Sequence, residues 1–535
     1  MTPVRDRPAE GLRLTEMVRE IPGQVDIIGD PDVRVHGVHH DSRRVEPGDL
    51  FVARHGAHVD GTRFIPQAED RGAAAIMVER SHVDADAGII ANVPHIIVDD
   101  AADALAFASA AVYGHPTFTL DVIGITGTNG KTTTSHLVRA AIDGALDRGH
   151  GGPPACGMIG TVGHIFGDTK LVAEHTTPEA DEIARVMARM RQLGATHVAM
   201  EVSSIALAMG RVRAVRFRVA AFTNFTQDHL DFHGSMEDYA AAKERLFFDM
   251  GPGSAVIHID DPLGRSIAAR VRAPLLRVSA QSGAGPEHAD IAPVHATLDA
   301  RGIDATLRTP RGTHRVRSRL VGRHNLENIV VAVGVACALE LDLPRACAAI
   351  GNECGVPGRL ERCDSEGDDV TVLVDYAHTP DALSRVLESV RNVSQRGRIF
   401  CVFGCGGDRD PKKRGPMGKA VADGADLLII TNDNPRTEDP VEIARPVEEA
   451  VRAAGVAKAE NASQLATAPR SYAVELDRSR AIRTAVLAAH PGDVVLIAGK
   501  GHEDYQILGT DKLPFDDRIE ARAALAERRV HGGGV

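Results

Sequence analysis

The chain has 535 residues, more than one hydrophobic core can organise, so roughly two to four domains are expected. A net charge of −12 and a pI near 6.1 give no reason to expect nucleic acid or an anionic membrane as a partner. Seven scattered cysteines without a CxxC pair argue against a disulfide framework or a zinc site, and they fit a reducing cytoplasm. The first residues lack the apolar stretch of a signal peptide, and no apolar run reaches about 18 residues, so we expect no membrane insertion.

Residues 1–118 are predicted to form a small α/β domain. The apolar runs "AAAIMV" at 73–78 and "PHIIV" at 94–98 predict strands, and the alanine-rich "DALAFASAAV" at 103–112 predicts a helix. The proline in "YGHPTFTL" at 113–120 marks the end of this domain.

Residues 119–355 are predicted to form a central P-loop ATPase-like domain with a parallel sheet. Strands are expected in "LDVIGITG" at 120–127, "GATHVAMEVSS" at 194–204, "FRVAAFTNF" at 217–225 and "GSAVIHIDD" at 253–261. Helices are expected between them, as in "KTTTSHLVRAAIDGAL" and "SMEDYAAAKERLFFDM". Strands that alternate with helices favour a mostly parallel sheet, and therefore an α/β fold.

Residues 356–535 are predicted to form a second, Rossmann-like domain. Four apolar runs each end in a polar or glycine-rich turn: "TVLVDYAHTP", "GRIFCVFGCGGDRD", "ADLLIITNDNPR" and "DVVLIAGKGHED". In open α/β sheets the carboxyl ends of the strands face the ligand, so these four turns are expected to line a site.

The stretch "VIGITGTNGKTTT" at 122–134 predicts a phosphate-binding loop with unusual glycine spacing. The Walker pattern places a glycine where this chain has Ile125. Gly127 and Gly130 still allow backbone N–H groups to turn toward an anion at a helix N-terminus. Lys131 is expected to reach the β- and γ-phosphates and Thr132 to offer its hydroxyl to Mg²⁺. A glycine turn that binds nothing is the competing reading, which Gly-Lys-Thr between a strand and a helix disfavours.

The loop "GTNGKTTT" resembles that of the Mur ligases and their folylpolyglutamate synthetase relatives. The resemblance implies amide-bond formation driven by ATP and Mg²⁺, through an acyl phosphate that an amine attacks. It also implies nucleotide contacts from "GRHNLENI", "PGRLE" and "VDYAHTP", although helix capping competes for the first. The implied ATP-binding residues are Gly127, Thr128, Asn129, Gly130, Lys131, Thr132, Thr133, Asn325, Arg359 and Asp375.

Two strand ends and one helix carry the implied metal site. "AMEVSS" presents Glu201, and "NFTQDHLDFHG" presents His229. The neighbouring Asp228 and His233 are more typical of hydrogen-bonded loop residues. A lysine such as Lys243 in "YAAAKERLF" is ordinarily exposed, but the resemblance implies a carbamate there that bridges to magnesium. The implied metal residues are Thr132, Glu201, His229 and carbamylated Lys243, and the implied catalytic residues are Lys131, Glu201, His229 and Lys243.

The resemblance also places a UDP-MurNAc-peptide acceptor. "HDSRRVEPGDLFVARHGAHVDG" at 40–61 resembles the uridine-nucleotide-binding domain of the Mur ligases that add the third residue of the cell-wall peptide, a start that folylpolyglutamate synthetases lack. "HTTPEA" and "SSIALAMGR" resemble acceptor-binding segments, with turn and capping chemistry as the alternative. His175 and Ile205 depart from the Asn and His frequent in the family. The implied contacts are Ser42 with 57–59 behind it, Thr176, Thr177, Ser203, Arg211 and Lys243.

The turn "DNPR" at 433–436 indicates which amine is added. Asn-Pro keeps the backbone out of helix, so Arg436 projects from a fixed turn. With Arg409 it can hold a carboxylate, while Glu503 holds an ammonium; an exposed ion-pair cluster is the alternative. Resembled ligases that carry DNPR add meso-diaminopimelate, and those that add L-lysine carry another sequence. The implied donor-binding residues are Arg409, Asp433, Asn434, Pro435, Arg436, Gly499 and Glu503.

The leading hypothesis is therefore a monomeric cytoplasmic ligase of peptidoglycan synthesis that joins meso-diaminopimelate to UDP-MurNAc-L-Ala-D-Glu. Three alternatives stay open: an L-lysine-adding ligase of the same family, a folylpolyglutamate synthetase-like ligase, and an inert nucleotide-binding module.

Overall fold

The computed structural model describes residues 10–54, 60–82, 93–147, 149, 152–285, 287–299, 302–353, 358–365, 367–394, 397–460, 462–467 and 469–532. The chain forms two compact units. The first comprises Met1–Val294, Leu307–His314 and Glu327–Ile350, and the second comprises His295–Thr306, Arg315–Leu326 and Gly351–Val535. Within the described ranges, no helix is both long enough and apolar enough to cross a bilayer.

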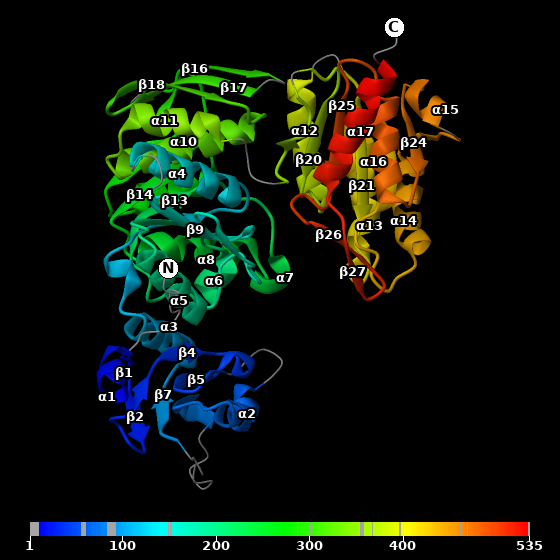
Figure 1. Cartoon of the computed structure of the whole chain (residues 1–535). Helices are drawn as coiled ribbons and strands as arrows, with labels where there is room; N and C mark the ends of the chain where they lie inside the picture. Colours follow the sequence, from blue (N-terminus) through cyan, green and yellow to red (C-terminus); the bar gives the residue numbers. More distant parts are fainter. Residues whose placement is uncertain are drawn as a thin grey trace. The chain divides into compact units, whose positions relative to one another are not determined.

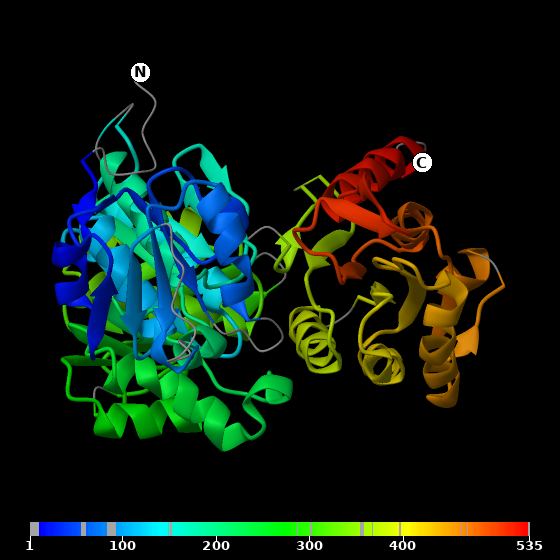
Figure 2. The same cartoon turned by 90° about the horizontal axis from the view of Figure 1, so that it is seen from below.

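A five-stranded sheet forms the N-terminal part of the first unit, blue in Figure 2. Its neighbours run parallel except for the pair β2–β7. Helices α1 (Leu14–Met17) and α3 (Ala101–Val112) cover one face, and α2 (Ile65–Asp70) covers the other. The predicted strands at 73–78 and 94–98 and the predicted helix are confirmed. The strand order is β2 (Val25–Ile28), β7 (His95–Val98), β6 (Ala75–Glu79), β5 (Asp49–Ala53) and β4 (Gly37–His39).

An eight-stranded sheet forms the middle of the first unit (Figure 1). It is parallel from β9 to β15, and an antiparallel hairpin of β10 and β11 extends one edge. The strand order is β11 (Thr169–Leu171), β10 (Gly163–Phe166), β9 (Cys156–Gly160), β12 (His197–Glu201), β8 (Asp121–Thr126), β13 (Phe217–Phe222), β14 (Ser254–His258) and β15 (Leu275–Val278). The parallel sheet predicted from the alternating pattern is confirmed.

The connections between the parallel strands of this sheet are helical, as expected. They are α4 (Lys131–Ala145), α5 (Ala180–Gln192), α6 (Ser204–Ala208), α7 (Leu230–His233), α8 (Met236–Phe248) and α9 (Pro262–Arg270). Since β8 lies between β12 and β13, the loops after all three strands meet at one edge.

A three-stranded sheet, not anticipated from the sequence, follows β15. It consists of β16 (Ala292–Asp299), β17 (Gly302–Thr309) and β18 (Gly312–Ser318), and α10 (Arg323–Ala338) and α11 (Leu343–Asn352) come next. Along β17, side chains alternate between buried and partly exposed from Ile303 onward. That alternation in "GIDATLRT" is the signal that predicts a half-buried strand.

The second unit holds a seven-stranded sheet that is parallel except where β19 pairs with β20. Its order is β19 (Glu361–Arg362), β20 (Thr371–Asp375), β25 (Val494–Ala498), β21 (Ile399–Cys405), β22 (Leu427–Asn432), β24 (Ser471–Val474) and β23 (Ala457–Lys458). Separate apolar clusters lie on its two faces. Helices α12 (Pro380–Val393), α13 (Arg414–Gly424) and α14 (Pro440–Ala453) cover one face, and α15 (Ala462–Thr467), α16 (Arg478–Ala488) and α17 (Asp517–Gly532) the other. This confirms the predicted Rossmann-like domain.

Candidate functional site

The predicted phosphate loop connects the end of β8 to the start of α4. Gly127 and Gly130 have φ of 150° and 81°, which side-chain-bearing residues rarely adopt. A Cβ on Gly127 would lie 1.9 Å from Thr223 Oγ1, and one on Gly130 would lie 2.2 Å from Asn328 Oδ1. Both positions therefore require glycine, although the glycine spacing departs from the Walker pattern.

Two lysines converge on one carbonyl of this loop. Lys131 Nζ donates to the carbonyls of Gly127 at 3.0 Å and Thr128 at 2.8 Å, and Lys243 Nζ donates to Gly127 at 2.8 Å. Lys243 is only 1% exposed, so the ordinary expectation of a solvated helix lysine is wrong here. Burial, and then the charge of Lys131, lower the pKa of Lys243 well below its usual value.

Glu201 lies beside Thr132, and both are residues that the family resemblance implies as ligands of one cation. Thr132 Oγ1 donates to Glu201 Oε2 at 2.8 Å, and the Thr161 N–H donates to Oε1 at 2.8 Å. Glu201 is fully buried because β12 pairs with β8, which places Glu201 opposite Ile125. A buried carboxylate next to a hydroxyl at a phosphate loop is a donor set that suits Mg²⁺.

His229 and Lys243 are brought together by a residue that the sequence analysis missed, Tyr239. The ring of His229 lies 6.1 Å from that of Tyr239, and Lys243 Nζ lies 4.5 Å from the same ring centroid. The Tyr239 hydroxyl is 3.1 Å from Thr128 Oγ1 of the phosphate loop. Tyr239 precedes Lys243 by four residues on α8, the spacing at which helix side chains meet, and this spacing could have revealed it.

The other two residues of the His229 segment have local roles. Asp228 Oδ2 lies 3.5 Å from His229 Nε2, and His233 Nε2 lies 2.9 Å from Ser204 Oγ. Asp228 Oδ1 also accepts the His229 N–H at 2.8 Å, so both side chains are hydrogen-bonded, Asp228 in a loop and His233 at the end of α7. Across the residues that the structure describes, His, Cys, Asp and Glu side chains form no cluster of three or more that would bind a metal.

The threonines and serine predicted to bind the acceptor surround the end of β12. Thr176 Oγ1 lies 3.0 Å from Thr161 Oγ1, and Thr177 Oγ1 donates to the Glu201 carbonyl at 2.9 Å. Ser203 caps α6 by accepting from the Ala206 N–H. Of these three hydroxyls, that of Ser203 makes the capping contact that was the alternative interpretation, while those of Thr176 and Thr177 contact residues distant in sequence at the same edge of the sheet as Glu201.

Arg211 joins a charged chain that connects the N-terminal and central sheets. Its guanidinium pairs with Glu179 at 2.6 Å, and Glu179 also pairs with Arg54 at 2.6 Å. Burial opposes ionisation of Glu179, but the two arginines outweigh it and lower the pKa of the carboxyl. His40 adds a second bridge, 2.9 Å from Asp181.

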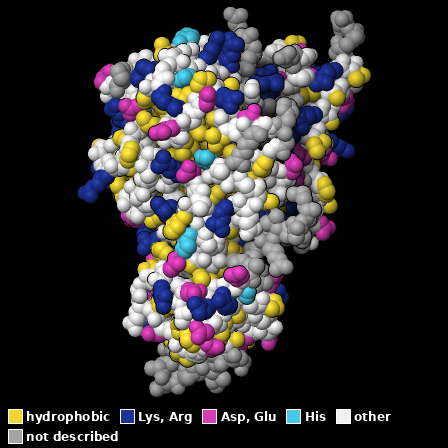
Figure 3. Space-filling view, turned by 60° about the vertical axis from the view of Figure 1, so that its left-hand side comes forward, with side chains coloured by type: hydrophobic (Ala, Val, Ile, Leu, Met, Phe, Trp, Pro, Cys, Tyr) yellow, Lys and Arg dark blue, Asp and Glu magenta, His cyan; other side chains and the backbone are white. Residues whose placement is uncertain are grey.

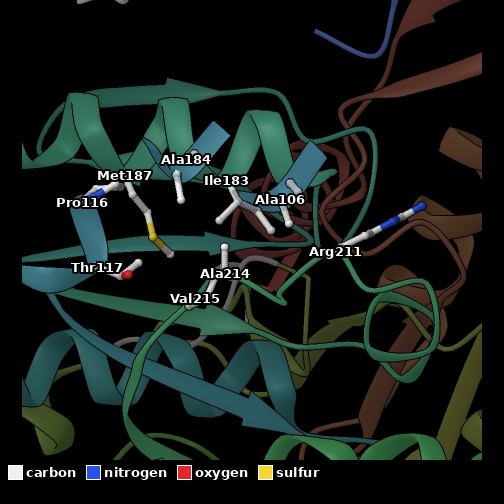
Figure 4. Close-up of a pocket in the computed structure, with 11 residues that line it drawn as sticks. Ala106, Pro116, Thr117, Ile183, Ala184, Met187, Arg211, Ala214 and Val215 are labelled. Carbon is white, nitrogen blue, oxygen red and sulfur yellow. The ribbon is translucent and has the colours of Figure 1, made fainter. Parts of the chain in front are cut away.

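Two cavities lie along this boundary. One of about 430 Å³ is lined by polar and apolar side chains, among them Arg54, Arg213 and Arg245. The other, of about 20 Å³, lies among apolar side chains of α3 and α5, and the guanidinium of Arg211 points away from it (Figure 4). The second has room for little more than a water molecule, so only the first can hold part of an acceptor.

The remaining acceptor predictions concern Ser42 and residues 57–59, and the two departures from the family pattern are His175 and Ile205. Ser42 is buried, and its hydroxyl donates to Gln67 Oε1 at 2.6 Å. Residues 57–59 lie outside the described residues. His175 is exposed and Ile205 is partly buried on α6. On the face shown in Figure 3, basic and acidic side chains are interspersed.

Of the predicted nucleotide residues beyond the loop, Asn325 and Asp375 are held by hydrogen bonds within the protein, and Arg359 contacts an aromatic ring. Asn325 Nδ2 donates to the Val321 carbonyl at 2.8 Å. Asp375 accepts the N–H groups of Leu360 at 2.7 Å and Ala377 at 2.8 Å, and burial raises the pKa of its carboxyl. The Arg359 guanidinium lies 4.8 Å from the ring centroid of Tyr376. Asn328, the second asparagine of "GRHNLENI", contacts the phosphate loop at Gly130 and Thr134.

The DNPR turn follows β22 and is fixed from both sides. Arg436 has φ of 52°, its N–H donates to the Ile507 carbonyl at 3.1 Å, and its Nη1 donates to the Gly407 carbonyl at 2.6 Å. A hairpin of β26 (Tyr505–Leu508) and β27 (Asp511–Pro514) lies beside the turn, and Gln506 Nε2 donates to the Asp433 carbonyl. Pro435 O would meet a Cβ on Gly407 at 1.9 Å, so the glycine loop after β21 and this turn are in close contact.

The remaining predicted donor-binding residues lie at the ends of the neighbouring strands. Arg409 is exposed after β21, and Gly499 follows β25 with φ of 122°. Glu503 Oε2 accepts from Asn434 Nδ2 at 3.0 Å and from Lys500 Nζ at 3.1 Å. The structure therefore brings Asn434 and Glu503 together and adds Lys500, which the sequence analysis quoted in "AGKGHED" without assigning a role.

The glycine loop connects a central parallel strand to a helix. Two lysines donate to one of its carbonyls, and Glu201 lies beside Thr132. These features place this chain in the class of P-loop nucleotide-binding proteins. Family models agree and are more specific. The Mur ligase catalytic domain matches residues 34–113, the middle domain 125–336 and the glutamate ligase domain 358–501. The chain therefore belongs to the Mur ligase family, whose members are ATP-dependent ligases.

Close relatives share one name, UDP-N-acetylmuramoyl-L-alanyl-D-glutamate–2,6-diaminopimelate ligase. The protein from Gloeobacter violaceus is 45% identical, over 94% of this chain and 96% of its own length. The one from Geobacter metallireducens is 43% identical, over 98% and 100%. A solved structure with the same name is 30% identical, has a TM-score of 0.68, and aligns over 97% of this chain and 99% of its own.

Proposed function

We propose that this chain joins meso-diaminopimelate to UDP-MurNAc-L-Ala-D-Glu with ATP, in peptidoglycan precursor synthesis in the cytoplasm. The observation that carries the proposal is the fixed DNPR turn beside Glu503, in a chain up to 45% identical to diaminopimelate ligases over nearly its full length. Diaminopimelate has a second amino-acid end and L-lysine has only an ammonium there. L-lysine would therefore leave the Arg436 guanidinium without a carboxylate partner, and a site built for a missing polar group can reject the analogue by roughly 10⁴-fold.

The phosphate loop supports the first half of the reaction. The γ-phosphate of ATP moves to the D-Glu side-chain carboxylate and leaves ADP and an acyl phosphate. Lys131 and the N–H groups of 127–133 hold the phosphates and stabilise the transferring charge. Thr132 and Glu201 are the residues that fit Mg²⁺, with His229 beside Tyr239 as a further candidate. Bound there, the cation would neutralise phosphate charge.

The environment of Lys243 supports the carbamate. Only an uncharged amine can add to CO₂, which gives a carbamate anion and releases a proton. Burial keeps the pKa of Lys243 far below its usual value, so the amine is available uncharged. The product would replace the neutral amine by an anion beside the Lys131 cation and would supply oxygens for the metal.

The second half of the reaction needs the acceptor and the amine. We place the acceptor along the boundary of residues 1–118 and 119–355, near Arg211 and the 430 Å³ cavity, and the amine in residues 356–535. The donor amine attacks the acyl carbon, phosphate leaves with the bonding electrons, and the amine loses a proton. We further propose that the chain acts as a monomer.

The test is phosphate release with ATP, Mg²⁺ and UDP-MurNAc-L-Ala-D-Glu, comparing meso-diaminopimelate with L-lysine. Turnover confined to diaminopimelate supports the proposal. Turnover with L-lysine keeps the reaction and overturns the assignment of the DNPR turn. Turnover with neither amine overturns the assignment of the acceptor. ATP hydrolysis would then be measured with folate-type acceptors, and its absence would indicate an inert nucleotide-binding module.

A further inference from the structure

Lys500 is a fully buried cation at the candidate donor site. It follows Gly499 at the end of β25 and has 0% of its surface exposed. Its Nζ donates to Asn434 Oδ1 at 3.0 Å and to Glu503 Oε2 at 3.1 Å, and it lies 3.6 Å from Asp433 Oδ1. Lysine is almost never fully buried unless it is paired, so this arrangement calls for a reason beyond packing.

Lys500 determines how the amide of Asn434 is oriented. The Oδ1 atom of Asn434 accepts from Lys500 Nζ and from the Ile507 N–H at 3.0 Å, while Nδ2 donates to Glu503 Oε2. A flipped amide would place its NH₂ group against two donors, so only this orientation satisfies the contacts. The amide is thus engaged within the protein, and it acts by holding Glu503 and the hairpin.

Counted over Asp433, Glu503 and Lys500, the site carries one negative charge in excess. Each of the two carboxylates lies within ion-pair distance of the Lys500 ammonium. Asp433 Oδ1 is buried and has no hydrogen-bond partner, because Lys500 lies beyond hydrogen-bond distance from it. One excess charge and one unsatisfied acceptor match a single ammonium group.

Without Lys500, the same pocket would not suit an amino-acid head group. The two partly buried carboxylates would repel each other, and Asn434 would lose the donor that fixes its amide. The excess negative charge would also repel the carboxylate of a zwitterion.

We propose that Lys500 is a positioning residue for the amine donor, which orients Asn434 and Glu503 and sets the pocket to accept one ammonium. This inference rests on the proposed function for the identity of the amine, but not for the role of Lys500.

The experiment compares Lys500→Met with Lys512→Met, a change on the adjoining hairpin at an exposed lysine that lies 3.6 Å from the Tyr505 ring centroid. We expect Lys500→Met to raise the KM for the amine at least 10-fold while the KM values for ATP and the acceptor change less than twofold. Lys512→Met should change none of them. Hydrogen exchange of the full chain should show faster exchange at 433–436 and 505–508 in Lys500→Met only.

A charge-restoring variant separates this role from a merely structural one. In Lys500→Arg a cation again pairs with Asp433 and Glu503 and can donate to Asn434, so the amine KM should recover at least threefold relative to Lys500→Met. An amine KM that stays within twofold of Lys512→Met, or equal rises in all three KM values, would overturn the proposal. If L-lysine proves to be the amine used, the proposed function fails, while an amine-confined KM effect still supports the role of Lys500.

Discussion

The buried pair of Arg478 and Asp517 allows the sharpest prediction about stability. Both side chains have 0% exposure, and the guanidinium donates to the carboxylate through Nε and Nη2, each at 2.7 Å. Arg478 also donates to the carbonyls of Asn432 at 3.1 Å and Ala498 at 3.0 Å, the last residues of β22 and β25. One ion pair thus connects the starts of α16 and α17 to both strand ends at the candidate donor site.

The loss of unfolding free energy depends on which buried charges and hydrogen bonds each substitution removes. Arg478→Leu leaves a buried carboxylate without a partner and should cost about 3–5 kcal/mol. Arg478→Leu/Asp517→Leu leaves no buried charge and loses two hydrogen bonds to strand carbonyls, about 1 kcal/mol each. The double variant should therefore be more stable than the single one by at least about 1 kcal/mol, although it carries more changes.

The assay is urea unfolding of the full chain, followed by hydrogen exchange at 427–432 and 494–498. It measures the unfolding free energy of the second unit without assuming two-state behaviour of the whole chain. Arg480→Leu is the matched control, because Arg480 lies on the same helix with 75% of its side chain exposed and should leave exchange unchanged. A double variant as unstable as Arg478→Leu would refute the reasoning, since the cost would then not come from an unpaired charge.

Three further predictions concern the first unit. Gly130→Ala should lower kcat/KM for ATP at least 100-fold, because its Cβ would overlap Asn328 Oδ1; unchanged ATP kinetics would contradict the loop geometry. Glu201→Gln should raise the Mg²⁺ concentration for half-maximal activity at least 10-fold with little change in melting temperature, and an unaltered Mg²⁺ titration would remove Glu201 from the metal site. Burial lowers the pKa of His40, but Asp181 outweighs burial and raises the pKa overall. The His40–Asp181 pair therefore stabilises the fold fully below pH 6.5, and this stabilisation is lost as the pH rises through the raised pKa. Replacing His40 by Asn should flatten stability against pH across that window by about 1 kcal/mol or less, and an unchanged slope would exclude the pair as its source.

Most of the fold could be predicted from local pattern. Apolar strands bounded by turns, and helices between them, specify a parallel sheet because only helical crossovers connect parallel neighbours in this way. The phosphate loop could also be predicted from the sequence, because Gly127, Gly130 and Lys131 lie within five residues. The three-stranded sheet at 292–318 was overlooked, although the alternation along β17 indicated it.

What the sequence by itself determined is the set of local conformations: strand, glycine loop, helix and the proline-fixed turn at 433–436. What only the tertiary structure decided is the environment of single charged side chains. Lys243 bonds to a carbonyl 116 residues away, Lys500 to an amide 66 residues away, and Arg478 to a carboxylate 39 residues away. The physical reason is that burial and electrostatic partners depend on which strand ends become neighbours, and this ordering is a property of the whole sheet that no local sequence pattern contains.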